Sequence, residues 1–128
     1  MFTQLNTGEK GSIEVVIFNY LDGYLNARAE QLSQAFHETC PLLSIEEEKL
    51  DRTEMSAWLE NLRDRQAKGD IRKAESKILG IDVSGNAAIA KVCLGFPKFV
   101  FTDYLSLLRI DGHWKIVNKT YSRTELSS

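Results

Sequence analysis

The stretch DYLSLLRIDGHWKIVNKTY, residues 103–121, decides the fold of this chain. Two runs of mixed apolar and polar residues flank Asp111-Gly112, a dipeptide that favours the tight turn of a β-hairpin. Side chains in a strand point alternately to opposite faces of the sheet, so each run has an inner and an outer face. These residues therefore predict a long antiparallel hairpin, whose facing decides which side chains enter the interior.

Charged residues indicate which face of this hairpin meets solvent. We place Arg109, Lys115 and Lys119 on the outer face, because Lys and Arg are rarely buried without a partner. Leu105 and Leu107 also fall on the outer face, where they would suit a second subunit better than water. The inner face then holds Trp114, Ile116, Asn118 and Thr120 on the second strand and Tyr104, Ser106, Leu108 and Ile110 on the first.

Three polar residues, Tyr104, Ser106 and Asn118, would lie among apolar neighbours on the predicted inner face. A buried polar group without a partner costs about 1–3 kcal/mol, so such residues either find a neighbour or line a cavity. Because three of them share one concave face, we expect a cavity. The alternative is a filled core in which neighbouring groups satisfy them.

The first half of the chain predicts helices. Apolar residues follow helical spacing after Ser12, a suitable N-cap, and a second short helix is expected at about residues 29–38, before Pro41. A third helix is expected to end at Gly69, and the acidic stretch 44–51 before it is expected to form a loop or a solvated first turn. The inward residues are Ile13, Val16, Ile17, Tyr20, Tyr24 and Leu25 in the first helix, Leu32, Ala35 and Phe36 in the second, and Met55, Trp58, Leu59 and Leu62 in the third.

The second half of the chain predicts strands. A further hairpin is expected around Ser84-Gly85-Asn86, so the order is three helices followed by four long antiparallel strands. Helices followed by strands indicate the α+β class, with the helices packed in the concave face of a strongly curved sheet. We expect one domain at residues 12–122, between a flexible arm at 1–11 and a tail at 123–128.

Composition narrows the function classes. The chain has 128 residues and a formal net charge of −2, so a nucleic-acid partner is not expected. No apolar run approaches the roughly 20 residues of a membrane span, and a cytoplasmic location is expected. His37 and Cys40 have the spacing of metal ligands, but two ligands do not make a zinc site. No phosphate loop or dinucleotide motif is present, so neither a metal nor a cofactor is expected.

Several segments together resemble the nuclear transport factor 2-like superfamily. They are a tyrosine-bearing first helix, QLSQAFHETC at residues 31–40, a third helix and the terminal hairpin. LLRIDGHWKIVNK, residues 107–119, looks like the branch named putative lumazine-binding proteins, close to the SnoaL-like proteins. The resemblance covers about residues 12–122. It implies a cone in which a bent sheet wraps round helices, with a pocket at the open end and a homodimer formed through the sheet.

The resemblance also brings in enzymes, because the superfamily includes the ketosteroid isomerases. Their chemistry uses an aspartate base, a tyrosine and a protonated aspartic acid. An ungapped match places Tyr20 at the tyrosine, Ser44 at the base and Ser106 at the second acid. A serine cannot act as an unassisted general base near pH 7, so isomerase chemistry of this type is not expected. The superfamily's dehydratases use histidine and aspartate, for which His37 is the candidate here; Asp103 falls on the outer face.

We therefore expect a protein that binds a small organic molecule of the planar heterocyclic kind in an apolar pocket with a few polar groups. The expected lining residues are Tyr20, Tyr24, Phe36, Met55, Trp58, Leu62, Tyr104, Ser106, Trp114, Ile116 and Asn118. One alternative is an isomerase, dehydratase or cyclase in which Tyr20 polarises a carbonyl and His37 moves a proton. A second alternative is an accessory or interaction domain whose pocket is vestigial.

Overall fold

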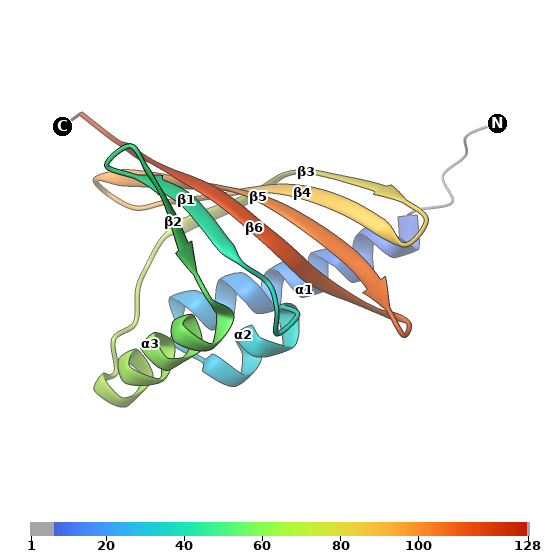
Figure 1. Ribbon diagram of the computed structural model, residues 1–128, viewed down its shortest axis with the longest axis horizontal. Coiled ribbons are helices and arrows are strands. Elements are labelled where there is room, and N and C mark those ends of the chain that lie inside the picture. Colours follow the sequence, from blue (N-terminus) through green and yellow to red (C-terminus); the bar gives the residue numbers. More distant parts are fainter. Residues whose placement is uncertain (1–6, 128) are drawn as a thin grey trace.

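A computed structural model describes residues 7–127, in which helices cover one side of a sheet (Figure 1). Three helices come from the first half of the chain, α1 (Thr7–Leu25), α2 (Ala29–Ala35) and α3 (Met55–Lys68). The strands are β1 (Leu42–Glu46), β2 (Lys49–Thr53), β3 (Glu75–Ser84), β4 (Ala87–Gly95), β5 (Phe99–Ile110) and β6 (His113–Glu125). None of the helices in this part of the chain is long and apolar enough to cross a membrane.

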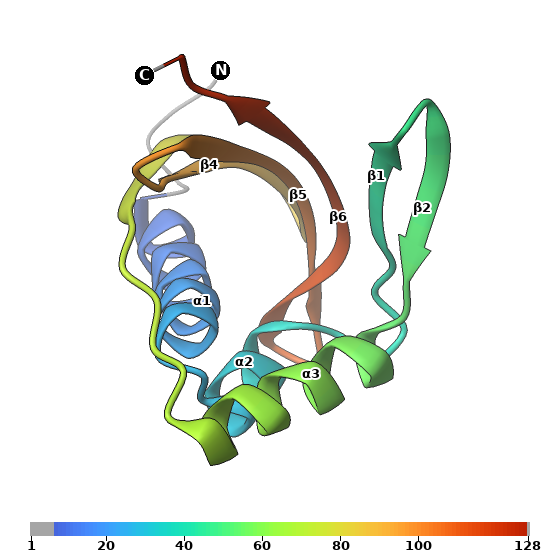
Figure 2. The same cartoon turned by 90° about the vertical axis from the view of Figure 1, so that its left-hand side faces the viewer.

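The strands form one sheet in the order β2-β1-β6-β5-β4-β3. Strands β1 and β6 pair in parallel, and the other neighbours pair antiparallel. Seen from one end, the sheet curls over α1, with α2 and α3 below (Figure 2). The predicted α+β class, with helices in the concave face of a curved sheet, is confirmed.

Tight turns join most of the strands. The predicted hairpins at Gly85 and at Asp111-Gly112 are present, and Asp111 (φ 51°) and Gly112 (φ 81°) both adopt the left-handed backbone that such turns need. The prediction of a loop at 44–51 is wrong, because β1 and β2 form a third hairpin there. Its turn uses Glu47 (φ 50°) and Glu48 (φ 68°), a conformation that glutamate rarely adopts. The turn therefore carries no residue signal that would reveal it.

Helix α1 begins earlier than predicted. It starts at Thr7, and the Ser12 hydroxyl donates to the carbonyl oxygen of Gly8 at 3.2 Å, inside the helix, where we had expected an N-cap. Residues 1–6 of the predicted arm lie outside the described residues. At the other end of the domain, β6 extends to Glu125. The domain boundaries as a whole stay a prediction.

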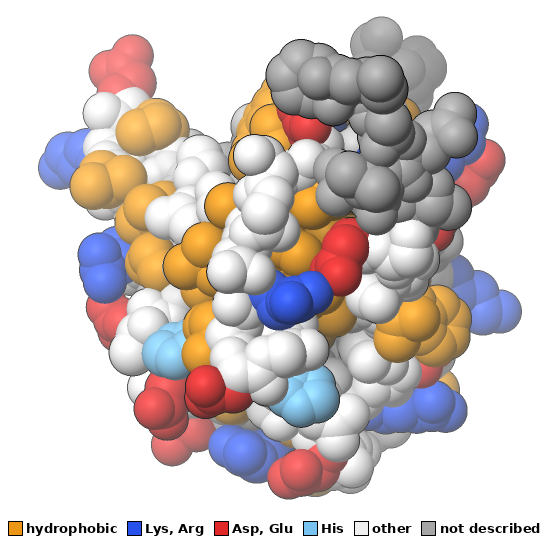
Figure 3. Space-filling view, turned by 90° about the vertical axis from the view of Figure 1, so that its right-hand side faces the viewer, with side chains coloured by type: hydrophobic (Ala, Val, Ile, Leu, Met, Phe, Trp, Pro, Cys, Tyr) orange, Lys and Arg blue, Asp and Glu red, His pale blue; other side chains and the backbone are white. Residues whose placement is uncertain are grey.

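The predicted facing of β5 is wrong. Asp103 is 1% exposed and lies against the helices, whereas Tyr104 is 51% exposed on the convex face. The two-residue turn pairs Arg109 directly with Trp114, so the two side chains share the inner face. Arg109 sits at the rim of that face, at the end of the molecule viewed in Figure 3, and forms an ion pair with Glu9 of α1 at 2.7 Å. The charge of Arg109 therefore led to the wrong assignment of the outer face of β5.

A β-bulge in β6 changes the face to which the later residues of this strand point. The register shifts between Ser106, which pairs with Asn118, and Leu107, which pairs with Ile116, so Val117 is an extra residue. Trp114 and Ile116 therefore point inward as predicted, while Asn118 lies on the outer side opposite Ser106. The same shift turns Lys119 into the interior.

Helices α1 and α2 approach closely at Gly23. A Cβ atom placed on Gly23 would lie 2.8 Å from the backbone nitrogen of Leu32 and 3.1 Å from its Cα atom. Backbone atoms cannot yield as a side chain tip can. We expect Gly23→Ala to lower the free energy of unfolding by about 1–3 kcal/mol, as other overpacked sites do.

The matched control for this variant is Gly11→Ala in the same helix, where an added Cβ meets nothing within 4 Å. This control should raise the free energy of unfolding by about 0.5–1 kcal/mol, through helix propensity alone. Urea unfolding followed by circular dichroism measures both variants. Equal effects of the two substitutions would show that the contact between the helices is not tight.

Candidate functional site

A cavity of about 160 Å³ lies between the helices and the concave face of the sheet. Helices α1 and α3 form one side, and β4, β5 and β6 form the other, with β1 and β2 completing the wall. The lining residues are Tyr20, Tyr24, Leu42, Thr53, Trp58, Asn61, Leu94, Phe101, Lys119 and Tyr121. Half of these side chains are aromatic, so the cavity presents flat apolar walls with a few polar groups.

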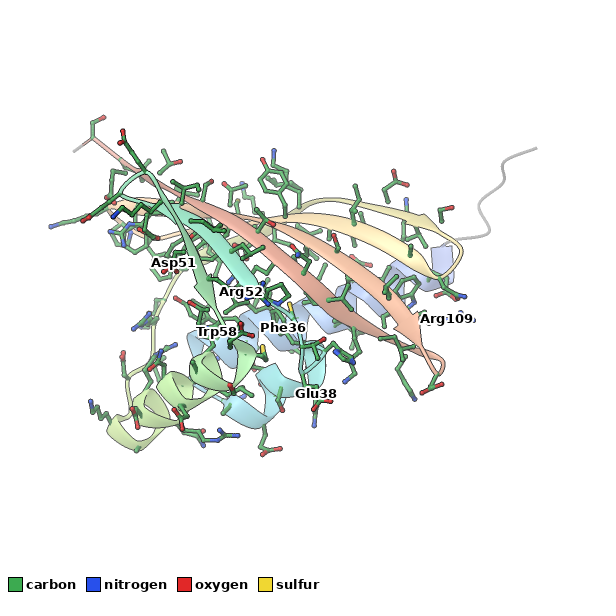
Figure 4. All side chains as sticks on the ribbon, viewed as in Figure 1. Phe36, Glu38, Asp51, Arg52, Trp58 and Arg109 are labelled. Atoms are coloured by element: carbon green, nitrogen blue, oxygen red, sulfur yellow. The ribbon has the colours of Figure 1, made fainter. Side chains whose placement is uncertain are left out.

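The aromatic walls hold one another in place. The ring of Phe36 packs edge-on against Trp58 and against Tyr20, with 5.2 Å between centroids in each pair. Figure 4 shows Phe36 and Trp58 close together beneath β1 and β2. Tyr20 and Trp58 also meet edge to face, with 6.0 Å between centroids. Such pairs add to the energy of burial and fix the ring planes, so the cavity is preorganised.

Lys119 brings a buried cationic side chain into this aromatic cavity. Its Nζ atom lies 4.5 Å from the ring centroid of Trp58, 4.8 Å from that of Tyr121 and 4.9 Å from that of Tyr20. The residue is only 7% exposed. Within residues 7–127 its Nζ atom forms no ion pair and no hydrogen bond. The three rings are therefore its closest partners.

Burial sets the protonation behaviour of Lys119. Loss of solvent lowers the pKa of its ammonium group, and the nearby Asp103 and Cys40 oppose this to a smaller extent. The faces of the aromatic rings also favour the charged form. The net direction is downward, because water solvates an ammonium group better than ring faces do. Lys119 is thus easier to deprotonate than a lysine at the surface.

A tyrosine and an aspartate pair behind the cavity wall. The Tyr20 hydroxyl donates a hydrogen bond to Oδ2 of Asp103, and both residues are buried. Burial, followed by the charge of Asp103, raises the pKa of Tyr20 well above its ordinary value, so its hydroxyl stays protonated. The other oxygen of Asp103, Oδ1, has no hydrogen-bond partner among the described residues.

Two arginines hold Tyr24 at the edge of the cavity. The guanidinium carbons of Arg65 and Arg72 lie 5.2 Å and 5.9 Å from its ring centroid. Arg72 also donates to the Tyr24 hydroxyl at 3.2 Å, and Arg65 donates to the Tyr24 carbonyl oxygen at 2.8 Å. Arg65 therefore ties α3 to the end of α1 and keeps this side of the cavity in place.

The structure brings together only part of the predicted pocket. Tyr20, Tyr24 and Trp58 line the cavity, and Phe36 supports two of their rings. The others are not lining residues of this cavity: Met55, Leu62, Trp114 and Ile116 are buried in the core, and Tyr104, Ser106 and Asn118 lie on the outer side of the sheet. The last three were misplaced because the bulge and the true hairpin register were not recognised.

The two predicted catalytic candidates do not converge. His37 follows α2, and its Nδ1 atom lies 2.7 Å from the Thr39 hydroxyl oxygen. It is half-buried and is not among the residues that line the cavity. The Tyr20 hydroxyl is engaged by Asp103. Within residues 7–127, no group of three His, Cys, Asp or Glu side chains could hold a metal ion.

Sequence reasoning missed the polar residues that matter most here. Lys119 and Asp103 were both placed outside, although correct pairing across the two-residue turn would have put Asp103 on the inner face with Trp114. Lys119 gave no such signal, because only the bulge at Val117 turns it inward. Thr53 was missed with the β1–β2 hairpin that carries it.

A mixed sheet curved over three helices, with a cavity on its concave side, is the fold of the nuclear transport factor 2-like proteins. A protein of unknown function with this fold from Silicibacter pomeroyi superposes with a TM-score of 0.80 at 19% identity, over 95% of this chain and 99% of that one. A second protein of unknown function with this fold, from Shewanella baltica, superposes with a TM-score of 0.80 at 24% identity, over 94% of this chain and 96% of that one. A ketosteroid isomerase-like protein from Erwinia carotovora atroseptica superposes with a TM-score of 0.71 at 13% identity, over 95% of this chain and 99% of that one.

The sequence identifies the family within this fold. Residues 8–122 match the family described as putative lumazine-binding, and the chain belongs to that family. No curated protein matches the sequence.

Proposed function

We propose that this protein binds a small planar heterocycle in the aromatic cavity, with a carbonyl or acidic oxygen of the ligand facing Lys119. The observation that carries the proposal is the position of Lys119, 7% exposed and surrounded by the rings of Tyr20, Trp58 and Tyr121. A buried ammonium group without an anionic partner is costly, and a ligand oxygen would remove that cost.

The size and shape of the cavity limit the ligand. Pockets for drug-sized ligands usually occupy about 300–1,000 Å³. The 160 Å³ here suits one or two fused rings. Flat walls such as the ring of Trp58 favour a planar aromatic ligand, because aromatic rings stack with an offset. Asn61 and Thr53 add polar groups that can orient the ligand.

The contacts of Tyr20 favour binding over catalysis. A tyrosine that polarises a substrate carbonyl must offer its hydroxyl proton to that oxygen. Here the proton goes to Asp103, while His37, the proposed proton carrier, lies outside the cavity wall. The enzyme alternative with Tyr20 and His37 therefore needs both residues to move, whereas binding at Lys119 relies on neither of those movements.

Lumazine is the direct probe of this proposal, because the family description names it and because it is a small fluorescent bicycle. We expect its fluorescence to change saturably, with one site per chain, when the protein is titrated into it. The absence of a saturable change up to about 1 mM, where binding is worth only about 4 kcal/mol, would contradict binding of this ligand class. Calorimetry under the same conditions checks the stoichiometry.

We also propose that two copies pair through the convex face of the sheet. This face exposes the apolar side chains of Ile89, Tyr104 and Leu108 on β4 and β5. The exposed Asp82 and Lys91 lie on the same face, because Asp82 pairs with Ile89 and Lys91 with Tyr104. Opposite charges on one patch suit a twofold interface, where the lysine of one copy can meet the aspartate of the other.

A charge placed on this face should separate the two copies. We expect the wild-type protein to elute at about twice the mass of one 14.5 kDa chain and Ile89→Glu to elute as a monomer. The matched control is Val15→Glu on α1, since Val15 is 60% exposed and Ile89 is 59% exposed. Size exclusion with light scattering decides the result. A wild-type monomer at micromolar concentration would rule the dimer out.

A further inference from the structure

We propose that Lys119 captures small aromatic aldehydes or ketones by forming an imine. The ligand enters through the cavity described above, so this inference rests on the proposed function and gives that site a covalent activity. The geometry that points to it is an amine inside an aromatic cavity, with its Nζ atom held by ring faces.

The amine of Lys119 has no competing partner. Lysines in folded proteins are usually exposed or paired with a carboxylate, and both situations keep the amine protonated. Within the described part of the chain, Nζ of Lys119 forms no ion pair and no hydrogen bond. Its lone pair is therefore free once the proton leaves. Because the residue is 7% exposed and lines the cavity, a carbonyl compound reaches it through that cavity.

The groups around the amine leave its pKa low. Asp103 on β5 is the nearby acidic group, and its Oδ2 atom already accepts the Tyr20 hydroxyl. Burial raises the pKa of the Cys40 thiol to about 12, so this neighbour is neutral near pH 7. The phenol of Tyr20, which faces the amine from α1, has a raised pKa and is neutral there too. Desolvated lysines of this kind are the ones that form Schiff bases.

The reaction balances without a further reagent. The lone pair of the neutral amine attacks the carbonyl carbon, and the carbonyl π electrons move to the oxygen. Both N–H hydrogens then leave with that oxygen as water, and a C=N double bond remains between ligand and lysine. No oxidation or reduction occurs, and the step is reversible because water hydrolyses the imine back to amine and carbonyl compound. A conjugated imine is planar and suits a cavity lined by aromatic rings.

Benzaldehyde with sodium cyanoborohydride tests the proposal, because the hydride reduces an imine to a stable amine. We expect one benzyl group per chain at neutral pH, and peptide mapping should place it on Lys119. Labelling should saturate with benzaldehyde concentration and should be faster than that of a surface lysine, because the lowered pKa of Lys119 leaves more of its amine unprotonated.

Two variants make the test specific. Lys119→Arg keeps the charge but cannot form an imine, so it should lose the fast label. Lys10→Arg is the control, because Lys10 is an exposed lysine of α1 that lies neither in the cavity nor on the face proposed for the dimer. This control should label like the wild type. Thermal unfolding of Lys119→Arg shows whether it is folded, and the peptide map of the wild type decides the question in either case.

Labelling spread evenly over surface lysines, or an adduct map of the wild type without Lys119, would overturn the imine proposal. The lumazine titration separates this failure from a failure of the proposed function. If lumazine binds and Lys119 is not labelled, only the imine proposal is overturned. If neither lumazine nor benzaldehyde reaches the cavity, both proposals are overturned.

Discussion

Trp114→Ala should lower the free energy of unfolding by about 3–5 kcal/mol, as for other buried aromatic residues cut back to alanine. Trp114 is buried on the inner face of β6, and its Nε1–H group donates to Glu9 Oε2 at 2.6 Å. Glu9 also holds Arg109 of β5 at 2.7 Å. The indole thus ties the first turn of α1 to the terminal hairpin, so its loss combines a cavity with a broken helix contact.

Trp114→Phe separates these two contributions. It keeps most of the buried ring and removes the donor, so we expect a loss of only about 1.5–3 kcal/mol, the usual value for a hydrogen bond to a charged group. Chemical unfolding followed by tyrosine and tryptophan fluorescence, with Trp58 present in both variants, gives the two values. A loss below 1 kcal/mol for Trp114→Ala would mean that the indole is not buried in the core.

Lys119→Met should weaken lumazine binding by about 10- to 100-fold, without unfolding the protein. A hydrogen bond from a charged donor contributes about 1.5–3 kcal/mol, and each 1.4 kcal/mol is a factor of ten in affinity. Methionine fills a similar volume and packs well against aromatic rings. Replacing a buried charge with an apolar side chain is often neutral or stabilising. Lys119→Met should therefore lose affinity for lumazine without losing stability.

The pH dependence of stability should change in the same variant. Burial lowers the pKa of Lys119 in the folded protein, whereas the unfolded chain keeps the ordinary value of 10.5. Between these two values the unfolded chain binds more protons, so Lys119 makes stability rise with pH in this window. Below the window the folded protein carries the full penalty of the buried charge. The free energy of unfolding of the wild type should therefore rise, relative to that of Lys119→Met, as pH rises towards 10.5.

Lys10→Met is the control for affinity, because it removes an exposed lysine of α1 away from the cavity and from the face proposed for the dimer. Its lumazine titration should match the wild type. If both methionine variants lose affinity equally, the effect comes from the net charge of the protein, and the cavity is not the binding site. Chemical unfolding of the wild type and of Lys119→Met at several pH values measures this difference. A wild-type stability that falls relative to that of Lys119→Met as pH rises would contradict the lowered pKa of Lys119.

The sequence predicted the architecture well because its strongest signals are local. Helical spacing around Tyr20 and the Asp111-Gly112 turn each depend on a few neighbouring residues, and both are present in the structure. The β1–β2 hairpin was not predictable in this way. Its Glu47-Glu48 turn uses a backbone conformation that glutamate does not favour, and β1 is held by β6, which lies far along the chain.

The site was predicted less well because it depends on the facing of two strands. We assumed that charges face water, and this put Arg109 and Lys119 outside. Arg109 is instead at an inner rim where Glu9 neutralises it, and Lys119 is turned inward by a bulge that no residue type announces. The helix residues Tyr20, Tyr24 and Trp58 do line the cavity, and helical periodicity could point to them because it needs no strand register. The position of Lys119, the cationic residue of the cavity, could therefore be learned only from the structure.

A crystal structure of the protein grown with saturating lumazine tests the central claim most directly. We predict planar ligand density in the cavity between Trp58 and Tyr121, with a ligand oxygen within hydrogen-bonding distance of Lys119 Nζ. Density for the ligand elsewhere, with the cavity still closed around an unpaired Lys119, would contradict the account.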